Sequence, residues 1–285
     1  MNDRHRHFRK ALKRIDTTAA IKKCSTFFLL FFIGRFAAFS QTRHGLRGMY
    51  IQWGYNTEWY TRSNLHFKGS VNGIPHDFTA YNVKGVDQND FDAIAKKPWE
   101  VSVPQYNYRI GFYLNQRKTK AIEFNFDHTK YIVGDNQRVR VKGYVGDQHF
   151  DNDTTVTREN LFHFEHTNGA NFYHINYVQF WPLNKTNRRA GYFVPMLKVG
   201  AGFMIPKTDV TMFGKRLDNR FHLAGYMASG EGGIKYYISH TWFLEGTAKT
   251  GYAKYTNALT VDGGKATHSF GYGELIMTIG YDINW

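Results

Sequence analysis

The chain contains 285 residues, of which 17% are aromatic, and it carries a formal charge of +14 at pH 7. This aromatic content excludes a disordered chain, since disordered segments have few aromatic residues. The mean hydropathy of −0.51 excludes a bundle of membrane helices. It is compatible with a membrane β-barrel, in which only every second residue faces lipid.

Much of the positive charge lies at the N-terminus. Residues 1–40 contain nine Lys or Arg and two acidic residues, which leaves 28 basic and 21 acidic residues, or +7, in the remainder. A nucleic-acid-binding protein concentrates its cations on one face or stripe of the folded domain. We therefore expect no nucleic-acid partner.

The first 40 residues resemble an export signal. Two lysines at positions 22 and 23 precede an apolar run at 24–33, and small residues follow at 38 and 40. This order is typical of a cleaved secretory signal peptide, and the run is shorter than the about 20 residues that a spanning helix needs. We expect residues 1–40 to be removed. The single cysteine, Cys24, lies in this segment, so the mature chain has no thiol chemistry.

The C-terminal segment alternates between apolar and polar residues, with Ile276 as the exception on the polar face. Its apolar face consists of Leu275, Met277, Ile279, Tyr281, Ile283 and Trp285. Alternation with a period of two predicts a β-strand with one apolar and one polar face.

Seven further segments have the same pattern, at 48–62, 105–115, 120–133, 171–181, 191–205, 221–238 and 241–255. Each is long enough to cross a bilayer as a tilted strand, which takes about 9–11 residues. Pro195 lies inside one of them, and because proline cannot donate to a ladder we expect a β-bulge there.

The connections between these strands alternate in length. Three are short, at 116–119, 182–190 and 239–240, and four are long, at 63–104, 134–170, 206–220 and 256–270. Short turns on one side and long loops on the other are typical of outer-membrane barrels, with both termini on the periplasmic side. The sequence therefore predicts an all-β fold: an eight-stranded antiparallel transmembrane β-barrel over 41–285, with short periplasmic turns and long extracellular loops. The alternative is a soluble β-sandwich or lipocalin-like barrel.

These features together resemble the small eight-stranded outer-membrane proteins of the OmpX type and the transmembrane domain of OmpA. The resemblance implies export to the outer membrane of a Gram-negative cell, with outer-membrane lipids and lipopolysaccharide as surroundings. It also implies that Tyr281, Ile283 and Trp285 form the insertion signal read by the barrel-assembly machinery. It implies no cofactor and assigns no function.

If the apolar faces contact lipid, the polar faces must fill the lumen. An eight-stranded barrel is just wide enough for side chains, and buried charges need partners. We therefore expect an ionic network rather than a pore. Its predicted members are Glu58, Arg109, Glu123, Asp127, Lys198, Glu231, Lys235, Glu245, Lys249, Glu274 and Asp282.

One segment invites comparison with an enzyme. Outer-membrane lipid A deacylases of the PagL type have a His-x-Ser-Asn element and an acid that orients the histidine, and Glu165, His166 and Thr167 resemble it in part. Here the hydroxyl residue directly follows the histidine, so in a strand the two side chains point to opposite faces. This departure counts against catalysis, because a nucleophile needs its base within hydrogen-bond reach.

The remaining expectations concern the loops, where barrel proteins carry function. His163 and Glu165 share a strand face, but no three-ligand set predicts a metal site. Residues 137–145 predict a hairpin strand whose basic face, with Arg138, Arg140 and Lys142, meets lipopolysaccharide phosphates or solvent. Residues 89–97 predict a short helix. The leading hypothesis is a non-enzymatic role in surface binding, adhesion or envelope integrity, with an unknown extracellular or envelope protein as a further partner. The alternatives are a lipid A-modifying enzyme and a narrow channel.

Overall fold

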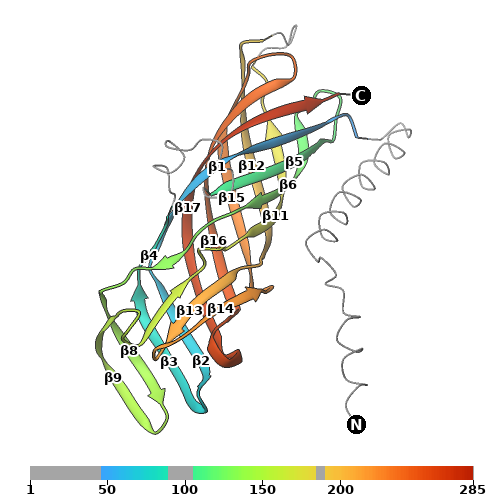
Figure 1. The fold of residues 1–285 in the computed structure, drawn as a ribbon. Helices are drawn as coiled ribbons and strands as arrows, with labels where there is room; N and C mark the ends of the chain where they lie inside the picture. The colour runs from blue at the N-terminus through green and yellow to red at the C-terminus, as the bar shows by residue number, and fades with distance from the viewer. Residues whose placement is uncertain (1–45, 89–104, 184–189, 285) are drawn as a thin grey trace, which may run out of the picture. The chain divides into compact units, whose positions relative to one another are not determined.

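A computed structural model describes residues 46–88, 105–183 and 190–284. Eight antiparallel strands form a closed ring, because β1 pairs with β5 on one side and with β17 on the other (Figure 1). Its order is β1 (Met49–Tyr60), β5 (Tyr106–Tyr113), β6 (Lys120–Asp127), β11 (Phe172–Phe180), β12 (Tyr192–Met204), β15 (Gly225–Tyr237), β16 (Trp242–Leu259) and β17 (Lys265–Ile283). The predicted eight-stranded antiparallel barrel is thereby confirmed.

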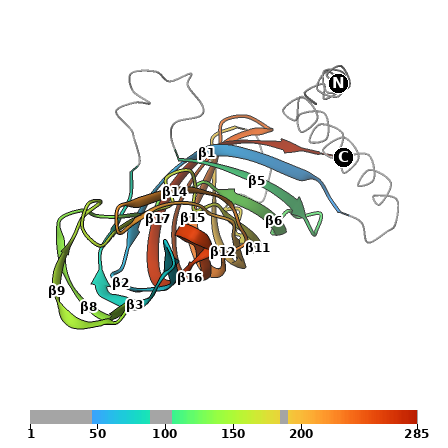
Figure 2. The same cartoon turned by 60° about the horizontal axis from the view of Figure 1, so that its bottom comes forward.

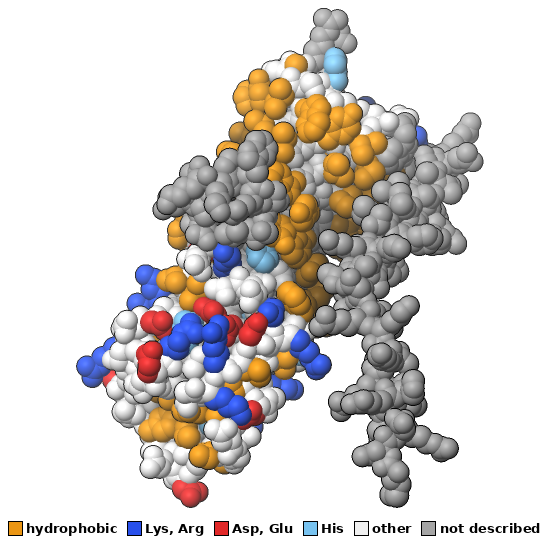
Figure 3. Space-filling view, viewed as in Figure 1, with side chains coloured by type: hydrophobic (Ala, Val, Ile, Leu, Met, Phe, Trp, Pro, Cys, Tyr) orange, Lys and Arg blue, Asp and Glu red, His pale blue; other side chains and the backbone are white. Residues whose placement is uncertain are grey.

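The ring carries its apolar side chains on the outside. On β17, Leu275 is 51% and Met277 71% exposed, whereas the alternating Glu274 and Thr278 are buried. Figure 3 shows apolar side chains spread over the outer surface of the barrel. A soluble barrel has the opposite arrangement, so this wall is suited to contact with lipid.

Pro195 lies within β12 without a bulge, so the bulge prediction is wrong. It pairs in register with Ile234 on β15. The carbonyl of Pro195 accepts from the Trp181 backbone amide, just beyond the last residue of β11. Because the N and O of a strand residue point to the same side, the missing N–H faces the end of β11, and the ladder to β15 loses no donor.

The sheet does not stop at the ring. The first residues of β17, Lys265–Thr267, pair with β2, and three more strands follow. The sheet therefore has twelve strands, of which eight close the barrel. The four additional strands are β2 (Ser63–Val71), β3 (Ile74–Val83), β8 (Gln137–Val145) and β9 (Gln148–Val156). The hairpin predicted around 137–145 is β8 and β9.

A second, five-stranded sheet packs against this extension. Its strands, in order, are β14 (Lys215–Phe221), β13 (Lys207–Met212), β10 (Phe162–Glu165), β7 (Ile132–Val133) and β4 (Gly85–Val86). Rings from the two sheets meet between them: the centroids of Phe67 and Phe162 lie 4.7 Å apart. Figure 2 shows β14 lying across the end of the barrel near β2, β3, β8 and β9.

We call these nine strands the outer domain. Buried apolar residues such as Leu65, Phe78, Val141 and Val210 form its core. The long connections were predicted as loops, but their described parts fold into a domain with an apolar interior. A 3-10 turn at Val261–Gly263 completes the described elements. The helix predicted at 89–97 and the cleavage site near residue 40 lie outside the described residues.

Within the described ranges, no helix has the length and apolarity that crossing a bilayer requires.

Candidate functional site: the barrel lumen and its outer rim

All eleven charged residues predicted to face the lumen are buried, and each is at most 4% exposed. They come from β1, β5, β6, β12, β15, β16 and β17. Strand alternation explains the placement, because every second residue of a closed sheet points inward.

Two cations form the centre of the lumen network. Arg109 Nη1 lies 2.6 Å from Glu231 Oε1 and 3.4 Å from Glu245 Oε1. Lys198 Nζ lies 2.7 Å from the same Glu245 oxygen and 3.1 Å from Glu123 Oε1. A buried charge is tolerated when it is paired and hydrogen-bonded. These contacts therefore connect five strands through the interior.

A second cluster lies between the centre and the outer domain. Lys249 on β16 contacts Asp127 on β6, and its Nζ lies 2.8 Å from Glu274 Oε2 on β17. His174 Nε2 lies 2.7 Å from Asp127 Oδ2. The Asn56 amide donates to Glu274 at 2.8 Å and to Glu58 at 2.7 Å, so it bridges two carboxylates that have like charge.

Neutral donors balance the excess of acids over bases in the lumen. The predicted set contains seven carboxylates and four cations, and unpaired carboxylates are costly to bury. Hydroxyl and amide groups donate to these oxygens: Tyr50 to Glu123, Gln52 to Glu245, Gln105 to Glu58, and Tyr113 and Tyr237 to Asp282. Sequence reasoning missed these donors, although Gln52 and Asn56 lie on the predicted polar face of their strand.

Aromatic rings close the lumen at the end with the short turns. The ammonium of Lys235 lies 3.8 Å from the ring centre of Phe243 and 4.1 Å from that of Tyr50, and 3.8 Å from Glu245 Oε2. A cation over aromatic faces is stabilised by the negative π surface. The Phe243 and Tyr50 rings therefore replace part of the stabilisation that hydration would give to this buried ammonium.

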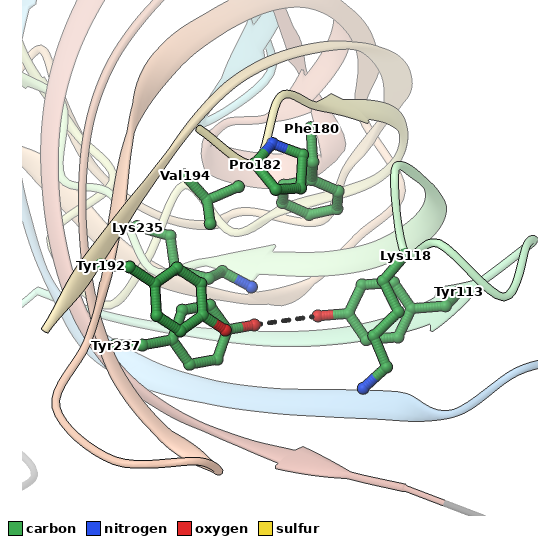
Figure 4. Close-up of a pocket in the computed structure, with 8 residues that line it drawn as sticks. All are labelled: Tyr113, Lys118, Phe180, Pro182, Tyr192, Val194, Lys235 and Tyr237. Carbon is green, nitrogen blue, oxygen red and sulfur yellow. Dashed lines mark hydrogen bonds between the residues drawn. The ribbon is translucent and has the colours of Figure 1, made fainter. Parts of the chain in front are cut away.

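Figure 4 shows the small pocket at this end, with Lys235 projecting between the Tyr237 and Tyr113 side chains. Lys118, Phe180, Pro182, Tyr192 and Val194 complete its lining. The rings on this side and the apolar core of the outer domain on the other enclose the lumen network. Side chains fill the described length of the barrel, as expected for this strand number.

His166 does not form an acid–base site with its sequence neighbours. Its ring is fully buried and packs against Tyr255 at 4.7 Å and Phe164 at 4.9 Å. Neither ring nitrogen has a hydrogen-bond partner among the described residues. Burial, together with the neighbouring His268, lowers the pKa of His166 well below its usual value. Glu165 and Thr167 form no hydrogen bond with His166; they are hydrogen-bonded to each other, and Glu165 also contacts His163.

Glu165 and Thr167 belong to a hydrogen-bonded row with His163. Thr167 Oγ1 donates to Glu165 Oε1 at 3.2 Å, and Glu165 Oε2 lies 3.0 Å from His163 Nε2. The other ring nitrogen lies 2.9 Å from Asp135 Oδ1. The carboxylates of Glu165 and Asp135 raise the pKa of His163 against the opposing effect of burial. The spacing of His163 and Glu165 indicated their shared face, whereas Asp135 is brought in by the fold.

The predicted basic face of β8 is paired with acids of β9. Arg140 Nε lies 2.6 Å from Asp151 Oδ1, and Lys142 Nζ lies 3.5 Å from Asp151 Oδ2. Arg138 Nε lies 3.6 Å from Asp153 Oδ2. These acids offset the positive charge of the face, and its contact with lipopolysaccharide phosphates or solvent stays a prediction. The alternating charges of the two strands meet across the hairpin, which the sequence of β8 alone does not reveal.

In the described part of the chain, no group of three or more His, Cys, Asp or Glu side chains is arranged to hold a metal ion. Tyr281 and Ile283 lie half-buried on the outward face of β17, and the Tyr281 ring packs edge-on against Trp242 at 5.0 Å. Trp285 lies outside the described residues. The insertion signal therefore stays a prediction.

No protein-family model matches the chain, and no curated protein matches its sequence. Among solved structures, the chain is similar to the outer membrane protein OprG from Pseudomonas aeruginosa, with 11% identity, a TM-score of 0.41 and coverage of 84% of this chain and 98% of OprG. It is also similar to Neisserial surface protein A, with 11% identity, a TM-score of 0.36 and coverage of 85% and 99%. The attachment invasion locus protein Ail of Yersinia pestis, solved with a heparin analogue, has 10% identity, a TM-score of 0.32 and coverage of 83% and 99%. At these identities the likeness concerns the fold alone.

Proposed function

We propose that this protein is an outer-membrane β-barrel that acts without catalysis, by presenting its outer domain for surface binding, adhesion or envelope support. The observation that carries this proposal is that the barrel and the outer domain place their apolar and charged side chains in opposite ways. The barrel has an apolar exterior and a lumen filled with paired charges. The outer domain has an apolar core and a charged exterior.

This division favours binding over transport. A chain that only needed to span the membrane would not require nine additional strands above it, and a conducting barrel needs a wider, water-filled interior. The Lys235 contacts with Phe243 and Tyr50 close one end of the lumen. We infer that the outer domain, held in place by the barrel, carries the function.

The test uses intact cells and a small change in the outer domain. Residues 144–149 at the tip of the β8–β9 hairpin are replaced by Asn-Gly, because Gly143 and Phe150 are paired in register and accept a two-residue turn. Capture of cells is measured on an array of immobilised glycans, extracellular-matrix proteins and lipopolysaccharide. We expect wild-type cells to be captured above cells that lack the protein, and the tip variant to reduce capture at least tenfold.

The matched control replaces Ser239 and His240, in the turn between β15 and β16 at the opposite end of the barrel, by Asn-Gly. We expect this variant to be captured as well as the wild type. Equal capture of wild-type cells and cells lacking the protein on every surface would contradict a binding role, as would loss of capture in the control alone.

The second candidate is a lipid A-modifying enzyme. The row of hydrogen bonds from Thr167 through Glu165 and His163 to Asp135 is the one arrangement in the described residues that favours it. A catalytic role would then use His163 rather than His166, because neither ring nitrogen of His166 has a hydrogen-bond partner among the described residues.

A further inference from the structure

Two buried histidines join the outer domain to the barrel wall. His166 directly follows β10 in the five-stranded sheet. His268 lies in the first part of β17, before the exposed apolar residues Leu275 and Met277. The centres of the two histidine rings lie 6.3 Å apart, and the ring planes are inclined by 28°. His166 is fully buried and His268 is 4% exposed. None of the four ring nitrogens has a hydrogen-bond partner among the described residues.

The surroundings of this histidine pair are aromatic. His268 stacks on Tyr255 from β16 at 5.0 Å, and Tyr131 from the segment between β6 and β7 lies 5.1 Å away. Phe164 from β10 lies 5.7 Å and Phe270 from β17 5.2 Å from His268. Tyr131 and Tyr255 are the titratable groups among these contacts, and burial raises the pKa of Tyr131 to about 12. Both hydroxyls are therefore uncharged wherever histidine titrates.

A neutral imidazole is tolerated in such a site, but an imidazolium is not. A buried charge without a carboxylate or an acceptor is strongly unfavourable, so the group stays neutral or moves to water. Two imidazolium rings at 6.3 Å would also repel each other. Both rings must therefore be neutral while they stay buried between the five-stranded sheet and the barrel wall.

We propose that His166 and His268 form an acid-sensitive contact that releases the five-stranded sheet of the outer domain from the barrel wall as the pH falls. The open state binds two more protons than the closed state. Below about pH 6.5, the usual pKa of histidine, each proton shifts the opening equilibrium about tenfold per pH unit, and two shift it about a hundredfold. Because opening takes up protons, the contact has its full stability above about pH 6.5 and loses stability as the pH falls below that value. The inference holds whether or not the outer domain binds a partner.

The experiment is amide hydrogen exchange on the full-length folded protein in detergent micelles between pH 7.5 and 4.5. After correction for the intrinsic exchange rate at each pH, we expect protection of β10 and β13 to fall up to about a hundredfold per pH unit below 6.5. Protection of β5 and β6 in the barrel should stay constant. The double variant His166→Phe/His268→Phe, which cannot take up these protons, should lose the pH-dependent step.

The matched control is His149→Phe on β9, where the histidine is exposed and its replacement should leave the step unchanged. If the double variant does not fold, as judged by migration of unheated samples on gels, the single variant His268→Gln serves instead. It should reduce the dependence from about a hundredfold to about tenfold per pH unit, because one proton remains. The proposal is overturned if protection of β10 in the wild type does not change with pH. It is also overturned if the slope is the same in the wild type and in whichever of these variants folds.

Discussion

Arg109 and Glu231 face each other across the barrel, with Nη1 and Oε1 2.6 Å apart. Arg109 lies on β5 and Glu231 on β15, which are four places apart in the ring of eight strands and so lie on opposite walls. The two residues are 122 positions apart in the chain. This pair connects opposite walls directly, and the other lumen contacts are arranged around it.

Removing one partner of this pair should strongly destabilise the barrel. In Arg109→Met the carboxylates of Glu231 and Glu245 lose a cation without regaining water. We expect a loss of about 3–5 kcal/mol in the free energy of unfolding, as for other buried pairs that lose one member. The measurement is urea unfolding of the protein in lipid vesicles.

The matched control for that measurement is Arg138→Met on β8. Arg138 pairs with Asp153 at 3.6 Å, but both side chains are more than half exposed. Surface pairs contribute about 0–1 kcal/mol, so this variant should unfold almost as the wild type does. Equal losses in the two variants would show that the lumen network is not a buried ionic structure.

The barrel should not conduct ions. Lys235 and the rings of Phe243 and Tyr50 close one end, and the Arg109 and Lys198 pairs fill the centre. We expect the folded protein to show no discrete openings in planar bilayers in 1 M KCl. Stepwise currents that disappear on heat denaturation of the sample would contradict this and support the channel alternative.

Lipid A should be unchanged by the protein. We expect mass spectra of lipid A from cells that lack the protein to match those from cells that express the wild type, His163→Ala or His166→Ala. His166 has no acid or hydroxyl within hydrogen-bond distance among the described residues. A mass difference that depends on His163 would establish an enzyme that uses the Glu165 and Asp135 contacts.

The His163 contact should have a pH dependence opposite to that of the buried histidine pair. Glu165 and Asp135 raise the pKa of His163. Its contribution is therefore complete below the unfolded pKa of about 6.5 and is lost as the pH rises through the raised folded value. Amide protection around Asp135 should fall in the wild type as the pH rises above about 6.5. It should show no such step in His163→Gln, while the pH-dependent opening at β10 should persist in that variant.

The outer domain should unfold without the barrel. Phe67 is fully buried between the two outer sheets, and Phe67→Ala should cost about 3–5 kcal/mol through lost burial and a new cavity. We expect limited proteolysis to cut the outer domain of this variant, while the barrel keeps its heat-dependent gel migration. Ile74→Ala, at a 53% exposed position of the outer domain, should resist proteolysis as the wild type does. Loss of the gel shift in Phe67→Ala would indicate that the two parts fold as one unit.

The positions of the eight barrel strands and the inward direction of their charges follow from local alternation. Side chains such as Leu275 and Glu274 differ in polarity over a period of two, and a closed sheet converts this into outside and inside. The alternation did not identify which lumen residues pair with each other. It placed Arg109 in the lumen but did not pair it with Glu231, and it missed Tyr50 because a tyrosine reads as apolar.

The sequence by itself therefore determined the barrel: which segments form the ring, which face of each carries the apolar side chains, and which charges lie within. The tertiary structure alone decided the rest. It folded the long connections into a domain, paired Arg140 with Asp151, separated His166 from Glu165 and set it beside His268. The physical reason is that alternation is a property of neighbouring residues, whereas ion pairs and core contacts join residues far apart in the chain and depend on how whole sheets pack.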